Sequence, residues 1–278
     1  MINKTNLFQR SLTVTTLVLC SGVSFVLVAR SPQIAHAQEP TSIRFNPANL
    51  EVPASIGEPK GRGAGGRRGC NTNDADDQLI PLVPTMETSD RAVRWGLTTR
   101  AHPTFWLHSP KGFQNGALIW LSVFDQTNHL LYRIPFQIPK ISNGVVRFAV
   151  PSTAPPLQLN TPYRWQFTVY CNSSSNDLAN LTFDTPFIMS GGVQRVQPSA
   201  ELQKRLAIAK TPLEQATFYA ENGIWYDSLT TLGNSVWDKK TSDTAMPLAW
   251  IELLQQSNLK ASAAAPIVKC CIPKQSQP

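Results

Sequence analysis

The sequence lacks the short motifs that mark several large classes of enzyme. It contains no G-x-S-x-G, the turn that presents the nucleophile of α/β-hydrolases, and no H-E-x-x-H, the helical zinc motif of metalloproteases. Histidine is also scarce, with 4 residues in a chain of 278. Hydrolases of these two classes are therefore excluded, and we predict no catalytic, cofactor-binding or metal-binding residue.

One glycine-rich stretch imitates a nucleotide-binding motif. Gly61, Gly63 and Gly66 in KGRGAGGRRGC form a G-x-G-x-x-G. A dinucleotide-binding fingerprint needs a strand before it and a helix after it, and the flanking PASIGEP and CNTNDADD favour neither. A P-loop would need Gly-Lys-Ser/Thr where this chain has Gly66-Arg67-Arg68. The sequence therefore predicts no bound nucleotide cofactor.

Residues of metal-binding type are present without metal-binding spacing. His102 and His108 would lie about 20 Å apart in an extended strand, too far to bind one ion. The acidic run NDADD at 73–77 begins like a calcium loop, but an EF-hand needs glycine and glutamate where Leu79 and Thr85 stand. No metal site follows from either pattern.

Charge is modest outside one short basic block. Loss of Lys4, Arg10 and Arg30 with a signal peptide would lower the formal net charge from +7 to +4. Because the rest of the chain is nearly balanced, we expect no nucleic-acid partner. The basic block is a candidate contact for anionic lipid or acidic polysaccharide, and a solvated linker is the alternative. Its cations are Lys60, Arg62, Arg67 and Arg68.

The N-terminal region has the features of an export signal. A short basic stretch precedes the uncharged run 11–29, and Ala-His-Ala at 35–37 provides a signal-peptidase site. We expect a signal peptide over 1–37, cleavage between Ala37 and Gln38, and export by the Sec route to the periplasm or beyond the cell. A membrane anchor formed by residues 11–29 is the alternative, because the run is long enough to span a bilayer.

Cysteines are few. Cys20 falls within the expected signal peptide, which leaves four cysteines and three connectivities in the exported chain. We expect Cys70 to pair with Cys171, because this bond would close a loop of about 100 residues and stabilise the fold by roughly 4–5 kcal/mol in the chain-entropy model. The sequence assigns no role to Cys270 and Cys271.

Composition changes twice along the chain. Residues 38–69 are rich in proline and small polar residues and predict a disordered leader. The following part, 70–195, has short apolar runs separated by turn signals and predicts an immunoglobulin-like antiparallel β-sandwich of about seven strands. The predicted strands are 93–98, 104–108, 117–124, 130–138, 145–150, 163–171 and 181–188.

Three of these strands are informative about faces. In 130–138 the apolar residues at even positions alternate with Arg133 and Gln137. In 163–171 one face carries Tyr163, Trp165, Phe167, Val169 and Cys171, and the other carries Arg164, Gln166 and Thr168. The run 117–124 is apolar on both faces, as in a central strand, and a turn signal after it predicts a hairpin over 117–138.

Residues 196–259 predict three to four helices packed on the sandwich. A capping box at 211–214 with proline at the first helical position marks a helix start, and Gly223 marks its end. A third helix begins near Trp225, and a flexible tail is expected over 260–278.

Several blocks together resemble a known family. They are RRGC, LVP at 82–84, GLTTRAHPTFWLHSP at 96–110, YRWQFTVYC at 163–171 and AENGIWYDSLTTL at 220–232. The chain is similar over most of its length to the domain of unknown function 928 family, secreted and mostly cyanobacterial proteins. The resemblance implies an exported protein in which Cys70 and Cys171 pair, and it carries over no catalytic residue.

The sequence leaves three hypotheses about function. The first is a non-enzymatic binding module of the cell envelope or periplasm, whose partner is a protein or a glycan. The second is a hydrolase of envelope polymers that uses the helix carboxylates Glu221 and Asp227 as an acid–base pair. The third is a binder of anionic lipid or polysaccharide surfaces that acts through the basic leader.

Overall fold

The computed structural model describes residues 42–47, 50–53, 79–89, 91–113, 116–170, 186–238 and 244–271. Several expected features lie outside these residues and stay predictions: the signal peptide with its Ala37–Gln38 cleavage site, the basic residues Lys60, Arg62, Arg67 and Arg68, and the Cys70–Cys171 disulfide. Within the part that the structure describes, none of the helices has the length and apolar character needed to cross a membrane.

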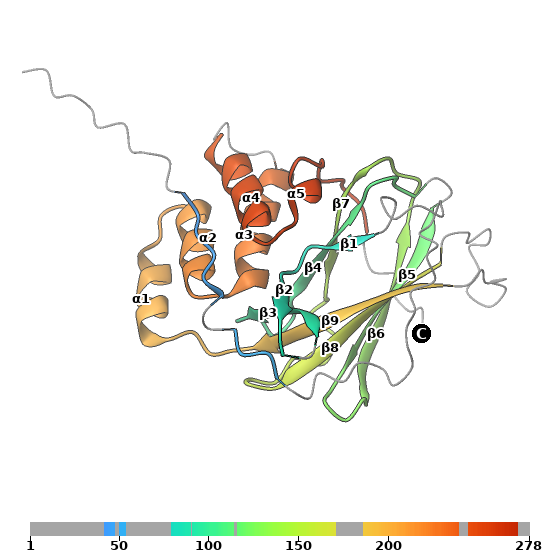
Figure 1. Cartoon of the computed structure of the whole chain (residues 1–278), viewed down its shortest axis with the longest axis horizontal. Helices are drawn as coiled ribbons and strands as arrows, with labels where there is room; N and C mark the ends of the chain where they lie inside the picture. The colour runs from blue at the N-terminus through green and yellow to red at the C-terminus, as the bar shows by residue number, and fades with distance from the viewer. Residues whose placement is uncertain are drawn as a thin grey trace, which may run out of the picture. The chain divides into compact units, whose positions relative to one another are not determined.

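The described chain is mainly β, as expected, with its strands in two sheets followed by helices. The three-stranded sheet has the order β1 (Ile80–Pro81), β4 (Thr104–Ser109), β7 (Gly144–Ala149). The six-stranded sheet (Figure 1) has the order β2 (Thr85–Glu87), β3 (Ala92–Thr98), β9 (Phe187–Arg195), β8 (Pro162–Tyr170), β5 (Ala117–Phe124), β6 (Leu130–Ile138).

The strand β5 lies inside the sheet, next to the edge strand β6, and forms the expected hairpin with it. It pairs antiparallel with β6 on one side and with β8 on the other, so Trp120 lies between Pro135 and Thr168. One pairing departs from the antiparallel expectation, because β9 runs parallel to β3. β9 lies between β3 and β8. It is antiparallel to β8, and because β3 and β8 run in opposite directions, β9 runs in the same direction as β3.

The last strand was expected too early in the sequence. The prediction ended at residue 188, whereas β9 spans Phe187–Arg195. Its two glycines resemble a turn signal, but both lie within the strand. The Trp165 ring packs directly on the backbone of Gly191, so a Cβ at this position would overlap the ring. A close approach of a ring to the backbone thus explains a glycine that local propensity assigns to a loop.

The inner faces of the two sheets contact each other through aromatic side chains. Phe105 of β4 meets Phe167 of β8 edge to face with ring centroids 6.0 Å apart. Phe148 of β7 meets Phe136 of β6 in the same way at 5.0 Å. These rings belong to one large core that also includes residues of the helices.

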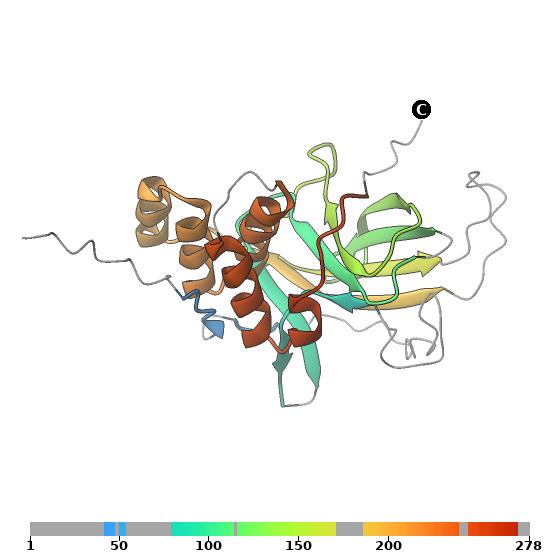
Figure 2. The ribbon, with the colours of Figure 1, turned by 90° about the horizontal axis from the view of Figure 1, so that it is seen from above.

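The described helices are α1 (Ala200–Ile208), α2 (Pro212–Glu221), α3 (Trp225–Asp238), α4 (Ala245–Gln256) and α5 (Lys260–Ala263). Figure 2 shows them gathered on one side of the strands. The predicted capping box begins α2: the Thr211 hydroxyl accepts from the backbone N–H of Glu214 at 3.2 Å, and the Glu214 carboxylate accepts from the Thr211 N–H at 3.3 Å. Both bonds satisfy N–H groups that have no partner within the helix.

The first turn of α3 joins the helices to the sheets. The Trp225 indole donates to the Leu82 carbonyl at 2.8 Å. The Tyr226 hydroxyl donates to the Gly192 carbonyl at 3.0 Å and accepts from the Trp165 indole at 2.8 Å. Because all three polar ends are paired, these large rings can be buried at little cost.

Part of the predicted leader is held against the helices. Ile43 is fully buried, its N–H donates to the Glu252 carboxylate at 3.2 Å, and its carbonyl accepts from the Gln256 side chain at 2.7 Å. Further along, Leu50 is buried against Trp95 on the outer side of β3. Residues 42–53 therefore depart from the predicted disordered leader where they are described, because two apolar side chains in this stretch find places in or beside the core.

The predicted flexible tail also departs from expectation over its described residues. The backbone N–H of Val145 donates to Pro266, and that of Val268 donates to the Val145 carbonyl, both at 2.8 Å. This segment thus continues the small sheet beside β7. Cys270 and Cys271 are joined to each other by a disulfide.

Candidate functional site

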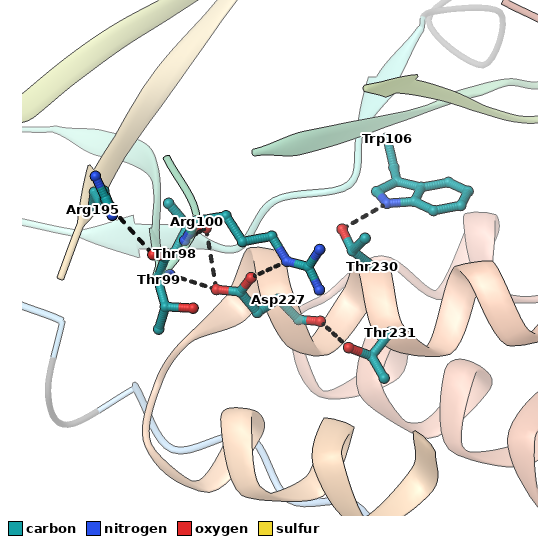
Figure 3. A network of polar contacts seen from close by, with 8 residues as sticks. All are labelled: Thr98, Thr99, Arg100, Trp106, Arg195, Asp227, Thr230 and Thr231. Atoms are coloured by element: carbon teal, nitrogen blue, oxygen red, sulfur yellow. Dashed lines mark hydrogen bonds and ion pairs between the residues drawn. The ribbon is translucent and has the colours of Figure 1, made fainter. Parts of the chain in front are cut away.

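The predicted acid Asp227 lies in the first turn of α3 and is fully enclosed. One carboxylate oxygen accepts from the Thr98 hydroxyl at 3.1 Å and from the Thr99 N–H at 2.6 Å. The other accepts from Arg100 Nε at 2.7 Å (Figure 3). All three donors come from the end of β3 and the residues just after it, so Asp227 connects the helices to the six-stranded sheet.

The environment of Asp227 explains its electrostatics. Its side chain is 0% exposed, whereas that of Arg100 is 49% exposed. Burial raises the pKa of Asp227, and the Thr99 N–H and the Arg100 guanidinium act in the opposite direction. Since both oxygens are engaged by donors of the chain itself, this carboxylate is placed as a structural link.

The second predicted acid, Glu221, lies at the end of α2. It pairs with Arg205 of α1 at 2.7 Å, and that arginine also lies over the Phe218 ring at 4.0 Å. Glu221 and Asp227 therefore bind different arginines, and the structure records no contact between them. The geometry gives no acid–base pair of the kind that the hydrolase hypothesis needs.

The histidines also serve local structure. His102 bonds the Ala154 carbonyl at 2.8 Å, and His129 meets the Thr127 hydroxyl at 3.0 Å in the turn between β5 and β6. His108 is buried between Ser262 and Asn143, at 2.9 and 3.0 Å. Among the described residues no group of three or more His, Cys, Asp or Glu side chains is placed to hold a metal ion.

A different set of polar and aromatic residues gathers on the outer side of the six-stranded sheet. The strand registers place them together, because alternate residues of paired strands share a face. We call this set the arginine–aromatic face. It consists of Trp120, Ser122 and Phe124 of β5, Arg133 of β6, and Arg164, Gln166 and Thr168 of β8.

Hydrogen bonds connect the polar residues of this face in a row along β8. Arg164 donates to the amide oxygens of Asn128 and Gln166, each at 3.1 Å. Gln166 donates onward to the Thr168 hydroxyl at 3.2 Å. The row therefore holds amide, hydroxyl and guanidinium groups in fixed positions beside the aromatic rings of β5.

Each arginine of the face lies near one ring of β5. The Arg164 guanidinium lies 4.2 Å from the centre of Phe124, a close cation–π contact. Arg133 lies 5.8 Å from the centre of Trp120, near the outer limit of such contacts, and its Nε donates to Ser122 at 3.1 Å. The first arginine is thus held firmly and the second loosely.

Arg164 is a buried cation without an anionic partner in the described part of the chain. It is 7% exposed, and its Nε has no hydrogen-bond partner among the described residues. The nearby Asp125 directs its Oδ1 to Thr127 and to the His129 N–H. Burial lowers the pKa of Arg164, but an arginine keeps its charge at any physiological pH.

The sequence predicted the side of the sheet for some residues of this face and not for others. Alternation in 163–171 and 130–138 separates Arg164, Gln166 and Arg133 from the core residues. It could not identify Trp120 and Phe124, because 117–124 is apolar on both faces and gives no signal for the side that carries function. The pairing of Arg164 with Asn128 depends on strand register, which no local pattern encodes.

The face is made of aromatic rings and of neutral or cationic polar groups. Its seven residues include no carboxylate, histidine or cysteine that could act as acid, base or nucleophile. They combine ring surface with oriented donors and acceptors, the usual composition of sites that bind polar ligands by shape and hydrogen bonds.

Comparison with known proteins gives a family and a distant structural likeness. No curated protein matches the sequence. Among solved structures, the chain is similar to the CARDB domain of a Pyrococcus furiosus protein crystallised with di-metal ions, at 11% identity and a TM-score of 0.24, over 46% of this chain and 100% of that one. The model of one family, described as Domain of Unknown Function (DUF928), matches residues 63–267, which is most of the chain. The protein therefore belongs to the DUF928 family.

Proposed function

We propose that this protein is a non-enzymatic binding module of the cell envelope, and that the arginine–aromatic face is its binding surface. The observation that carries the proposal is the row of oriented polar groups from Asn128 to Thr168 beside the Trp120 and Phe124 rings. Such groups are costly to fix on a sheet surface, because ordering long side chains costs conformational entropy. Preorganised donors and acceptors reduce the corresponding cost when a ligand binds.

The two sheets support a more specific fold within this proposal. We propose an immunoglobulin-like sandwich, since Phe105 and Phe148 of the small sheet pack on Phe167 and Phe136 of the large one. In such a fold one sheet surface is packed and the other is available to a ligand.

The cellular location is part of the same proposal. A signal peptide over 1–37 would deliver the protein by the Sec route to the periplasm or the outside of the cell, and retention of residues 11–29 would anchor it to the membrane. N-terminal sequencing of the protein isolated from its cells distinguishes the two, because cleavage predicts a chain that begins at Gln38.

The binding proposal is tested on isolated envelope polysaccharide. We expect the purified protein to co-sediment with the polymer and Trp120→Ala to reduce its affinity by about tenfold, a typical loss for an aromatic anchor. The matched control is Trp237→Ala, because the Trp237 ring of α3 also carries an arginine, Arg147, at 4.7 Å but lies outside the face. Equal loss in both variants, or no co-sedimentation of the wild type, would refute the proposal.

The same polymer separates the binding proposal from the hydrolase hypothesis. Release of reducing ends that disappears in Glu221→Gln would favour the hydrolase over the binding module. We expect no release, since the Glu221 carboxylate is engaged by Arg205 and the Asp227 carboxylate by three donors.

A further inference from the structure

We propose that the ligand of the arginine–aromatic face is an acidic oligosaccharide, with its carboxylates bound at Arg133 and above Arg164 and with a sugar ring on Trp120. This inference rests on the proposed function and narrows it to one chemical class.

The charge of the face points to an anion. The strands β5, β6, β8 and β9 contain no Asp or Glu, whereas two arginines lie on the face that they form. Arg164 is buried there, and no carboxylate pairs with it in the described chain. An uncompensated buried charge is unfavourable, so an anion at this place would gain from the existing positive potential.

The donor geometry points to carboxylate. Arg133 is exposed and donates from its Nε to the Ser122 hydroxyl at 3.1 Å. An arginine can bind a carboxylate through two parallel hydrogen bonds, and such charge-assisted bonds are stronger than those between neutral groups. Arg133 lies 5.8 Å from the centre of the Trp120 ring, so their cation–π contact is weak. Little interaction energy is lost when a sugar ring replaces Arg133 on Trp120.

The remaining groups favour a sugar over a lipid surface. The exposed aliphatic side chains beside the face are Leu130, paired with Phe124, and Ile188, paired with Thr168. They lie at opposite ends of the face, so they form no continuous apolar surface of the kind that inserts below lipid headgroups. The amide of Gln166 and the hydroxyl of Thr168 instead offer donors and acceptors to hydroxyl groups. From Trp120 to Phe124 the strand extends for about 13 Å, long enough for a short oligosaccharide.

The test compares two probes with the same backbone. Binding of an α-1,4-linked hexagalacturonate and of its fully methyl-esterified form is measured by calorimetry on the full chain at low and physiological salt. We expect the acidic probe to bind at least about tenfold more tightly, and this preference to shrink as salt rises. Equal affinity for both probes would overturn the inference, because the ester keeps the sugar backbone but replaces each negative charge by a neutral methyl ester.

Variants locate the charge that matters. Arg133→Gln should weaken binding of the acidic probe by about tenfold and leave the ester unaffected, since only the charge-assisted bonds are lost. Arg164→Lys keeps the buried charge but not the planar donor geometry, and we expect a smaller loss. The matched control is Arg147→Gln, which removes an arginine stacked on Trp237 outside the face. The same weakening in Arg147→Gln as in Arg133→Gln would refute the assignment.

The outcomes for the two proposals differ. If the ester binds as tightly as the acidic probe and this binding is lost in Trp120→Ala, the face is a site for neutral sugars. The proposed function would then stand, and the inference of an acidic ligand would be wrong. Binding to phosphatidylglycerol vesicles that needs Arg133, without binding of either sugar, would also overturn the inference. If neither envelope polysaccharide nor either probe binds, the proposed function fails as well.

Discussion

Asp227 and Arg164 are both buried and ionisable, yet their surroundings differ. Three donors of the chain surround the carboxylate of Asp227, one of them the guanidinium of Arg100. Arg164 has two amide oxygens and the Phe124 ring, all without formal charge. A satisfied buried charge holds a fold together, whereas an unsatisfied one is a place where a ligand can contribute the missing charge.

The link at Asp227 can be tested by Asp227→Asn. An asparagine has one acceptor oxygen and an NH2 group, so at least one of the three donors would face another N–H. We expect the free energy of unfolding, measured with urea, to fall by about 1–3 kcal/mol. The control is Glu221→Gln, whose ion pair with Arg205 is partly exposed and should contribute less than about 1 kcal/mol. An equal loss in the two variants would contradict the assignment.

His108 predicts how stability depends on pH. Asn143 Oδ1 can only accept from Nε2, so the neutral ring accepts from the Ser262 hydroxyl at Nδ1. Burial lowers the pKa of His108, and the unfolded chain therefore binds the proton at a higher pH than the folded protein. The stability that His108 contributes is complete above the usual histidine pKa and is lost as the pH falls below it.

We therefore expect the free energy of unfolding, measured with urea, to fall as the pH is lowered from 7.5 to 5.5 in the wild type. In His108→Gln it should fall less over the same interval. The control is His129→Gln, because the His129 side chain is 84% exposed and its replacement should change the free energy of unfolding at pH 7.5 by no more than about 0.5 kcal/mol. A wild-type stability that rises over this interval on acidification would show that the sign is wrong.

At the scale of elements, the sequence predicted the elements whose residues follow a clear period. The hairpin β5–β6, the strand β8 and the capped helix α2 all fall at the expected residues. The strand β9 and the segment around Ile43 were missed for a shared reason. Their places depend on a distant side chain, the Trp165 ring for Gly191 and the Glu252 carboxylate for Ile43, and a local pattern contains no information on either.

The segment around Ile43 should contribute to stability although it precedes the stretch that matches the family. Ile43 is fully buried, so Ile43→Ala should lower the free energy of unfolding by about 2–5 kcal/mol through lost burial and a cavity. The control is Ile208→Ala in α1, because Ile208 is 72% exposed and should change stability by no more than about 0.5 kcal/mol. A neutral result for Ile43→Ala would mean that this segment packs only loosely.

At the scale of the whole described fold, helices and sheets share one core. The rings of Trp225 and Tyr226 lie in that core, and their polar ends bind Leu82 and Gly192 of the β part. Two parts that share a core in this way are expected to unfold together rather than in separate steps.

The prediction is a single transition, followed by circular dichroism at 222 nm for the helices and by tryptophan fluorescence for the core. Tyr226→Phe removes the hydroxyl that accepts from Trp165 and donates to Gly192. Both transitions should therefore move together to lower denaturant concentration, and the free energy of unfolding should fall by about 1–2 kcal/mol. Loss of the helical signal ahead of the fluorescence change would show that the helices form an independent unit.

The place of β9 also determines when the large sheet can be completed. This strand lies between β3 and β8, so a chain that has emerged only as far as Tyr170 has the hydrogen-bonding edges of both strands open at once. Open edges of this kind pair readily with other chains. The protein is therefore most prone to aggregate when β3 and β8 have formed but Phe187–Arg195 is still missing, and a truncation just before this strand would leave both edges open.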